Sequence, residues 1–498
     1  MGNNLPRIVI AGLAGDSGKT IVSLSLAAIL KQRGLAVSVF KKGPDYIDAA
    51  WLSFVTGSPC RNLDTYLALP DDVYRSFCAN AAKADFAIIE GNRGIYDGKD
   101  VSGTHSTAGL AKLLQAPVVL VVDVTKATRT VAALIKGIID FEPGLHIAGV
   151  VLNRVGGNRH RQIVTESIEK YCGIPALGAI PRQASEGTLI PGRHLGLITP
   201  AEYDANAKLS STLVNIADKY LDIDNIMKIA NEAATLKYDE NINYNDKQSK
   251  SAQVKIGYFA DSIFTFYYPE NLEALENEGA ELVPVSSVVD KMLPEIDALY
   301  IGGGFPETQA DRLAANKSMM ASVRKAAVIG MPIYAECGGL IYLARSLAYN
   351  DKIHQMAGIF PIDLTMHEKP VGHGYTALTI DQLNPFFEIG AKIKGHEFHY
   401  SGIADNQNET GLGQLKSCMA VHTGVGLGNK RDGLLYNNTF ACYTHIHALG
   451  MKSWAKNLVQ SAILYHNNNG HSGQNGRTIL DPNDLAQDDN SRLAISSR

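Results

Sequence analysis

Short apolar, β-branched runs alternate with helix-length segments through the first half of the chain. The runs occupy residues 8–12, 37–40, 86–90, 118–123 and 147–153. Strands that are separated by helix-length connections pair in parallel through right-handed crossovers. The pattern therefore predicts an α/β domain with three layers and a mainly parallel sheet over residues 1–230.

A polar stretch over residues 231–253 interrupts this alternation, and its composition is typical of a solvated linker. Further strand-like runs follow at residues 255–259, 281–285, 298–301 and 333–336, so we expect a second α/β domain over residues 254–465. The tail over residues 466–498 is polar and of low complexity. It cannot bury enough apolar surface to offset the entropy of ordering, so we expect it to be disordered.

The composition and the net charge indicate which kinds of molecule the protein binds. A chain of 498 residues with 45% hydrophobic and 19% charged residues can bury substantial cores in several domains. Its formal net charge of −4 provides no basic field for nucleic acid or an anionic membrane, so we expect neither as a partner. We expect small-molecule substrates instead. The sequence leaves it undecided whether the protein forms a homodimer.

The cysteines and the N-terminus bear on the compartment. The six cysteines form no C-x-x-C pair and show no metal-ligand spacing. The N-terminus lacks a basic region followed by a long apolar stretch, and the longest apolar run, residues 117–122, is too short to span a bilayer. These features predict reduced thiols in a cytoplasmic protein without a membrane anchor.

A glycine-rich segment joins the first predicted strand to a helix-like run. Backbone N–H groups of such a loop curl around phosphate oxygens, a lysine adds positive charge, and the hydroxyl that follows faces magnesium. The strict pattern would place its first glycine where Leu13 stands, so a chance Gly-Lys-Thr loop stays an alternative. The predicted ATP-binding residues are Gly12, Gly15, Ser17, Gly18, Lys19 and Thr20.

Magnesium that is shared with ATP phosphates takes one or two carboxylates, which we expect at the ends of neighbouring strands. Glu90 closes one apolar run, and Asp45 lies just past another. Together with Thr20 they are the predicted metal ligands, although Glu90 alone could also cap a turn. Asn153 ends a further strand, where it either contacts the nucleotide base or simply terminates the strand.

The second predicted domain contains a candidate nucleophile. An apolar run ends in the segment AECGG, which predicts a strand, a tight turn and a helix start, with the Cys337 sulfur lifted above the sheet. A thiolate needs a base beside it, and His445, after another apolar run, is the best placed histidine. A triple glycine that ends at Gly304 can present N–H donors to an oxyanion. The alternatives are a buried structural thiol, a packing histidine and a plain glycine-rich turn.

Taken together, these motifs resemble the cobyrinic acid a,c-diamide synthases, which are glutamine-dependent amidoligases. The resemblance spans about residues 7–465 in unbroken order. It implies an ATP-binding domain similar to dethiobiotin synthetase, followed by a class I glutamine amidotransferase domain of the cobyric acid synthase type. The motifs are the glycine-rich loop at 12–20, KGPDYID at 42–48, NLD at 62–64, EG at 90–91 with YDG at 96–98, RHLGL at 193–197, FYYPENL at 266–272, GGG at 302–304, AECGG at 335–339 and YTHIH at 443–447.

The resemblance also implies a thiol mechanism. Cys337 would attack the side-chain amide of glutamine, and His445 would raise its nucleophilicity and shuttle the proton. Backbone N–H groups near Gly304 and Gly338 would hold the oxyanion while ammonia is released. Enzymes of this type are thought to work without a third, acidic triad member, and here Ile446 and His447 follow His445, with no glutamate expected nearby.

In the ATP-binding domain, the resemblance implies that Lys19, Thr20, Asp45 and Glu90 hold Mg-ATP while an acetate of a tetrapyrrole attacks the γ-phosphate. The acyl phosphate then accepts ammonia and becomes a carboxamide. In the family's usual reaction, the c and then the a acetate are amidated.

Because the sequence departs from the family pattern at several positions, it does not decide which tetrapyrrole is the substrate. Many cobyrinate enzymes have proline where this chain has Ala49, and hydrophobic residues where it has Asn92 and Arg93. These stretches also look like the sirohaem amidases, so sirohaem or sirohydrochlorin is an alternative substrate. Arg93 can pair with a substrate carboxylate or lie at the surface as a plain charge. Asp48 and Asp97 are further predicted substrate-binding residues, with a role in turns as their alternative.

Three other classes rank lower. A partitioning-type ATPase would have a second lysine where the loop has Ala14, and that class leaves Cys337 without a role. A non-catalytic amidotransferase fold is disfavoured because Cys337 and His445 are both present. The cobyric acid synthase branch, which amidates other side chains, differs around the NLD and KGPDYID segments.

Overall fold

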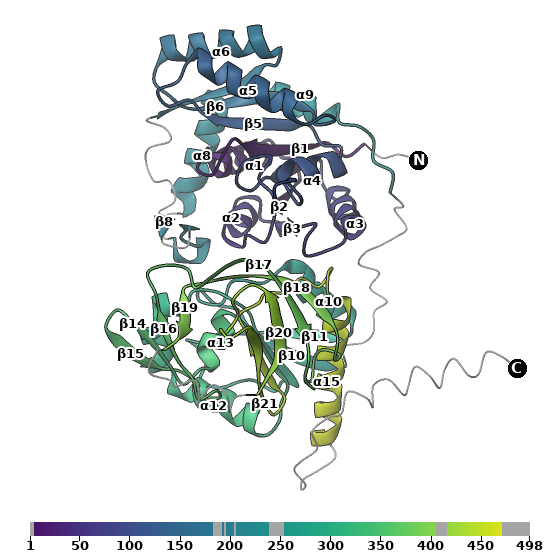
Figure 1. Cartoon of the computed structure of the whole chain (residues 1–498), viewed down its shortest axis with the longest axis vertical. Coiled ribbons are helices and arrows are strands. Elements are labelled where there is room, and N and C mark those ends of the chain that lie inside the picture. The colour runs from purple at the N-terminus through teal and green to yellow at the C-terminus, as the bar shows by residue number, and fades with distance from the viewer. Residues whose placement is uncertain are drawn as a thin grey trace, which may run out of the picture. The chain divides into compact units, whose positions relative to one another are not determined.

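The computed structural model describes residues 4–182, 192–193, 196–203, 206–238, 253–404 and 416–470. It divides into two compact units, Met1–Tyr244 and Asn245–Arg498 (Figure 1). This division falls inside the linker predicted over 231–253, of which residues 239–252 lie outside the described residues, as do residues 471–498 of the predicted tail. Helix α15, Lys452–Gly470, continues past the predicted end of the second domain at residue 465.

The first unit contains the predicted parallel sheet. Its seven strands lie in the order β3-β2-β4-β1-β5-β6-β7, and every neighbouring pair is parallel. Because the strands are parallel, the carboxyl ends of β1, β2 and β4 meet at one edge of the sheet, where α/β proteins bind ligands. The strands are β1 Arg7–Gly12, β2 Val37–Lys42, β3 Arg61–Leu63, β4 Phe86–Glu90, β5 Val118–Asp123, β6 Ile147–Val155 and β7 Ala176–Pro181.

Helices connect these strands and cover the sheet (Figure 1). Helix α1 is apolar nearly all round, and its residues from Val22 to Leu30 are buried. It shares a core cluster with β1, β2, α2 and α8, so the segment after the glycine-rich loop is firmly anchored. The helices are α1 Lys19–Gln32, α2 Ile47–Thr56, α3 Pro70–Ala81, α4 Thr107–Leu113, α5 Arg129–Phe141, α6 Asn158–Cys172, α8 Asn206–Tyr220 and α9 Ile223–Asn231.

The second unit contains a nine-stranded mixed sheet in the order β11-β10-β12-β13-β22-β21-β20-β17-β18. The half from β11 to β22 is parallel, and the half from β22 to β18 is antiparallel. The parallel strands are β10 Val254–Phe259, β11 Ala280–Val285, β12 Ala298–Ile301, β13 Ile333–Glu336 and β22 Thr439–Cys442; the others are β17 Gly372–Ile380, β18 Lys392–His399, β20 Ser417–Thr423 and β21 Arg431–Tyr436.

A separate four-stranded sheet, β15-β14-β16-β19, belongs to the same unit. Its strands are β14 Ser346–Tyr349, β15 Lys352–Gln355, β16 Asp363–Met366 and β19 Ser401–Ile403. The larger sheet separates two cores, because successive strand residues point to opposite faces. In β13, for example, Ile333 and Ala335 pack in the core with helices α12 (Lys317–Val328) and α13 (Gly338–Leu343), while Tyr334 packs on the other face with α15.

Among the described residues, none of the helices combines the length and the apolar composition needed to cross a membrane.

Candidate functional site

The glycine-rich loop lies between β1 and α1, where the sequence predicts it. Gly18 has a φ of 97°, and a Cβ built there would lie 2.2 Å from Nδ2 of Asn153. This close approach explains why glycine is needed at that position. The Asn153 amide donates to the backbone carbonyl of Ser17 at 3.0 Å, and the Ser17 hydroxyl bonds back to the Ala14 carbonyl at 3.0 Å. Asn153, predicted as a contact of the base, thus supports the loop itself.

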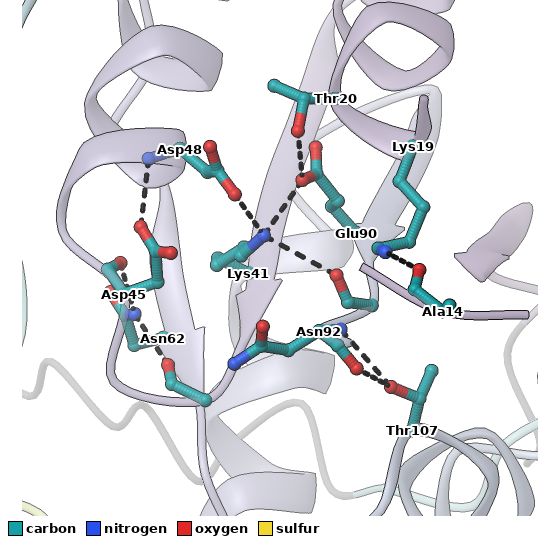
Figure 2. Close-up of polar contacts among 12 residues, drawn as sticks. Ala14, Lys19, Thr20, Lys41, Asp45, Asp48, Asn62, Glu90, Asn92 and Thr107 are labelled. Carbon is teal, nitrogen blue, oxygen red and sulfur yellow. Dashed lines mark hydrogen bonds and ion pairs between the residues drawn. The ribbon is translucent and has the colours of Figure 1, made fainter. Parts of the chain in front are cut away.

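Lys19 and Thr20 open helix α1 at this loop. The Lys19 ammonium donates to the Ala14 carbonyl at 3.0 Å, and the Thr20 hydroxyl donates to Oε1 of Glu90 at 3.0 Å (Figure 2). Burial, and then the positive charge of Lys41, lower the pKa of Lys19. An anion such as a phosphate would relieve both effects, because a nearby negative charge stabilises the ammonium form.

Lys41, at the end of β2, links two carboxylates beneath the loop. Its ammonium lies 2.5 Å from Oδ2 of Asp48 and 2.8 Å from Oε1 of Glu90, and its side chain is 1% exposed (Figure 2). Burial opposes the charged form, but the carboxylates of Asp48 and Glu90 outweigh it and raise the pKa of Lys41 well above its ordinary value. Lys41 is not among the predicted site residues, because its partner Glu90 becomes a neighbour only when β2 and β4 pair.

Glu90 and Thr20 are the two predicted metal ligands that the structure brings into contact. Burial raises the pKa of Glu90, and the Lys41 ammonium counteracts that rise. The Oε2 atom of Glu90 is buried and has no hydrogen-bond partner. A hydroxyl and a carboxylate oxygen with a free lone pair fit a magnesium ion that is held mostly by phosphate oxygens and water. The described residues contain no group of three or more Cys, His, Asp or Glu side chains that would hold a metal by itself.

Asp45, the third predicted metal ligand, lies in the turn between β2 and α2. Its Oδ1 accepts the backbone N–H of Asp48 at 2.9 Å, so it holds the first turn of α2 (Figure 2). Burial, and then the charge of Asp48, raise the pKa of Asp45 to about 6. The Asn62 amide donates to the carbonyls of Gly43 at 2.7 Å and Asp45 at 2.9 Å. Of the two aspartates in this turn, Asp48 is the one that shares the Lys41 ammonium with Glu90.

Arg93 and Asp97, predicted to bind substrate, lie on the turn after β4 and are exposed. The Asp97 carboxylate accepts the N–H of Gly94 at 2.8 Å, and a Cβ on Gly94 would lie 2.6 Å from the Leu13 carbonyl. The turn therefore packs directly against the glycine-rich loop. An exposed guanidinium beside a phosphate-binding loop is a suitable partner for an anionic substrate.

Cys337 lies at a strained turn between β13 and α13. Its φ and ψ are 48° and −97°, a region that non-glycine residues rarely adopt, and its side chain is buried. Its backbone N–H donates to the Cys442 carbonyl at 2.7 Å, which ties the turn to the adjacent strand β22. Burial, and then the charge of Glu307, raise the pKa of the Cys337 thiol. The resting group is therefore the thiol, and its proton must leave during attack.

The predicted oxyanion glycines lie side by side. A Cβ built on Gly338 would lie 3.0 Å from the backbone N of Gly304, and one on Gly304 would lie 1.7 Å from the Ile263 carbonyl. Neither position tolerates a side chain without movement of the backbone. The structure thus brings the triple-glycine turn against the residue that follows Cys337, as an oxyanion site formed by backbone N–H groups requires.

His445 follows β22, the strand that pairs with β13. A Cβ on Gly303 would lie 3.2 Å from its Nε2, so the imidazole faces the glycine turn. Its Nδ1 lies 3.3 Å from Oε2 of Glu336, and both side chains are buried. The expectation that no glutamate lies near His445 is therefore wrong. The carboxylate comes from the residue before the thiol, far away in sequence, and only the pairing of β13 with β22 reveals it.

Comparisons with known proteins find a family match in each of the two units. Residues 8–188 match the family described as the CobQ/CobB/MinD/ParA nucleotide binding domain, and residues 255–452 match the CobB/CobQ-like glutamine amidotransferase domain. The chain therefore joins a nucleotide-binding domain to a glutamine amidotransferase domain.

Relatives match over nearly the whole chain, and each of the following is named cobyrinate a,c-diamide synthase. The protein of Magnetococcus marinus is 42% identical over 92% of this chain and 97% of its own length. That of Archaeoglobus fulgidus is 40% identical over 92% and 98%, and that of Methanosarcina barkeri is 39% identical over 92% and 96%. With this identity and coverage, the chain belongs to the cobyrinate a,c-diamide synthase family.

Proposed function

We propose that this protein is an ATP- and glutamine-dependent ligase that converts the a and c acetate carboxylates of cobyrinate into carboxamides. The observation that carries the proposal is the coexistence of two sites in one chain. A strained thiol lies at the edge of one sheet, and a phosphate-type loop above a buried carboxylate lies at the edge of the other. The family's name and its two domains support the same reaction.

In the thiol site, the Cys337 sulfur attacks the side-chain carbonyl carbon of glutamine while its proton passes to His445. The carbonyl electron pair moves onto oxygen, where the N–H groups of Gly304 and Gly338 stabilise the charge. His445 then returns the proton to nitrogen, and the C–N bond breaks to give ammonia and a thioester. Water hydrolyses the thioester to glutamate and regenerates the thiol.

In the ATP-binding site, the loop N–H groups and Lys19 hold the phosphates of the nucleotide. Thr20 and Glu90 are the oxygen ligands that would hold magnesium, whose charge would offset that of the phosphates. Asp45, the third predicted ligand, holds the turn that carries Asp48. A substrate acetate attacks the γ-phosphorus and displaces ADP. Ammonia then attacks the acyl phosphate, and inorganic phosphate leaves as the amide forms.

The alternative substrates are sirohaem and sirohydrochlorin. A direct test incubates the protein with ATP, magnesium and glutamine against each tetrapyrrole separately, and weighs the products. We expect two amidations of cobyrinate, each of which replaces OH by NH₂. If sirohaem or sirohydrochlorin is amidated and cobyrinate is not, the family's reaction stands but the assignment of its substrate fails.

We also propose a cytoplasmic location and small-molecule substrates only. All six cysteines are free thiols, which fits a reducing compartment. The expected homodimer stays a proposal, and analytical ultracentrifugation of the purified chain would test it.

A further inference from the structure

We propose that Glu336 is a positioning residue of the thiol site, whose carboxylate holds Nδ1–H of His445 and thereby leaves Nε2 free to accept the thiol proton. The inference rests on the proposed function of this site. It gives the site an acidic member from the strand before the nucleophile, in place of a residue that follows the histidine.

The sheet register places the two side chains together. Strands β13 and β22 are parallel neighbours, and Glu336 pairs with Cys442, which precedes His445 by three residues. Oε2 of Glu336 lies 3.3 Å from Nδ1 of His445, with side-chain exposures of 0% and 3%. Hydrogen bonds in catalytic sites are often this long without substrate, and they shorten when the reaction proceeds.

The surroundings of Glu336 match an ionised carboxylate. Its Oε1 accepts the Tyr334 hydroxyl at 2.9 Å and the backbone N–H of Ile446 at 3.3 Å. Burial, and then the charge of Glu336, raise the pKa of Tyr334 well above its ordinary value, so the phenol remains a donor. With these two donors on Oε1, Oε2 is the oxygen that accepts the proton on Nδ1. An ionised carboxylate accepts all three bonds, whereas a protonated one would have to donate in one of them.

Two further contacts fix the imidazole plane. The ring of His396 stacks on that of His445, with centroids 4.9 Å apart and planes at 19°. Burial, and then the charge of His445, lower the pKa of His396 well below its ordinary value, so His396 is neutral. Gly303 lies against the Cε1–Nε2 edge of the ring, because a Cβ built on it would lie 2.4 Å from Cε1 and 3.2 Å from Nε2. In this orientation Nδ1 lies toward the carboxylate of Glu336, and the edge that includes Nε2 lies along the glycine turn.

This orientation determines how the proton moves. When the Cys337 sulfur bonds to the amide carbon, its proton moves to Nε2, and His445 becomes a cation next to the Glu336 carboxylate. The carboxylate stabilises that cation without itself taking a proton. The same proton then leaves Nε2 for the departing nitrogen. Because burial and Glu307 raise the pKa of the Cys337 thiol, a base in the correct tautomer is essential.

A second buried pair provides a matched control. Glu270 lies with Oε2 3.7 Å from Nε2 of His447, two residues past His445, and both of these side chains are also buried. Replacing Glu270 by Gln changes the charge and the hydrogen bonding of a buried glutamate in the same region, whose carboxylate faces His447.

The test compares Glu336→Gln, Glu336→Asp and Glu270→Gln in the full chain. In Glu336→Gln the amide can donate to Nδ1, which would put the proton on Nε2 and remove the base. We expect the glutaminase kcat to fall by at least about 100-fold, the scale of general base catalysis, while KM stays near its wild-type value. Alkylation of Cys337 by a glutamine-analogue diazoketone should slow in parallel. Glu336→Asp should recover part of the rate, and Glu270→Gln should retain it.

Three other outcomes would contradict either the role of Glu336 or the proposed function. If Glu336→Gln retains wild-type glutaminase and alkylation rates, the positioning role is overturned while the proposed function stands. A loss of ammonium-dependent amidation together with a lower unfolding temperature in Glu336→Gln would show a structural role and would also overturn it. Wild-type protein without any glutaminase activity would overturn the proposed function first.

Discussion

Burial shifts the proton equilibria of single residues in both sites, but the neighbours decide the direction. The Cys337 thiol is buried near the carboxylate of Glu307, and both effects raise its pKa. The Lys41 ammonium is buried between the carboxylates of Asp48 and Glu90, which raise its pKa despite burial. The Cys337 thiol is therefore neutral until a base removes its proton, whereas the Lys41 ammonium is permanently charged next to the glycine-rich loop.

Replacement of Cys337 by Ser should abolish the use of glutamine and retain amidation with ammonium salts. The hydroxyl is a far weaker nucleophile at this position, whereas ATP is bound in the other unit. The two activities are measured on the same purified variant, with the wild type as control. Loss of both would show that the sulfur has a structural role instead.

Replacement of Lys41 by Met should destabilise the first unit by about 3–5 kcal/mol, because it leaves the Glu90 carboxylate buried without its cation. Urea unfolding of the full-length wild type and of the Lys41→Met variant measures this difference in the free energy of unfolding. The control is Lys136→Met, which breaks an exposed ion pair with Asp140 and should cost under about 1 kcal/mol. Equal effects of the two substitutions would mean that the buried ammonium contributes no more than a surface charge.

At the scale of helices and strands, functional groups gather where parallel strands end. The ends of β1, β2 and β4 supply the loop, Lys41 and Glu90, and the ends of β13 and β22 supply Cys337 and His445. Turns complete each site, as Asp45 shows by holding the first turn of α2.

Replacement of Asp45 by Asn should stabilise the protein in a pH-dependent manner. The pKa of an aspartate in an unfolded chain is about 3.9. In the folded protein, the pKa of Asp45 is about 6. The folded state therefore binds the proton more tightly, so ionisation of Asp45 costs stability progressively as pH rises through this window. Asparagine keeps an oxygen that can accept the Asp48 N–H but has no charge.

The free energy of unfolding of Asp45→Asn should thus exceed that of the wild type only slightly near pH 4. The difference should grow up to about pH 6 and then level off. Urea unfolding across that pH range measures it. The same substitution at Asp222, which caps α9 at the surface, measures the effect of removing charge at a helix cap. A gain that is independent of pH would contradict the burial of the Asp45 charge.

The sequence predicts the elements whose signals are local. Apolar runs that alternate with helices indicate the parallel strands, and the residues after them include the loop at Lys19, Glu90 and Cys337. The four-stranded sheet does not follow from periodicity, because its strands are only three or four residues long. The antiparallel half of the second sheet does not follow either, because β17, β18 and β21 contain glycine, which is depleted in strands. Lys41 and Glu336 were missed for a related reason. Glu90, one partner of Lys41, lies on the neighbouring strand β4, and His445, the partner of Glu336, follows the neighbouring strand β22. Only the strand order of the folded sheet brings each of these pairs together.

At the scale of the whole molecule, one chain contains two compact units, each with its own site. The division near Tyr244 falls in a segment whose polar composition is visible in the sequence. The proposed reaction links the units chemically, because the ammonia released at Cys337 is consumed at the acyl phosphate formed beside Lys19. Each amide formed should therefore require one glutamine and one ATP.

The most direct measurement of this coupling supplies ATP, magnesium, cobyrinate and glutamine labelled with heavy nitrogen in its side-chain amide. We predict a product with two carboxamides that both contain the heavy nitrogen, formed together with equimolar glutamate, ADP and phosphate. ATP consumption without amide formation, or glutamine hydrolysis without any incorporation of its nitrogen, would contradict a glutamine-dependent amide ligase.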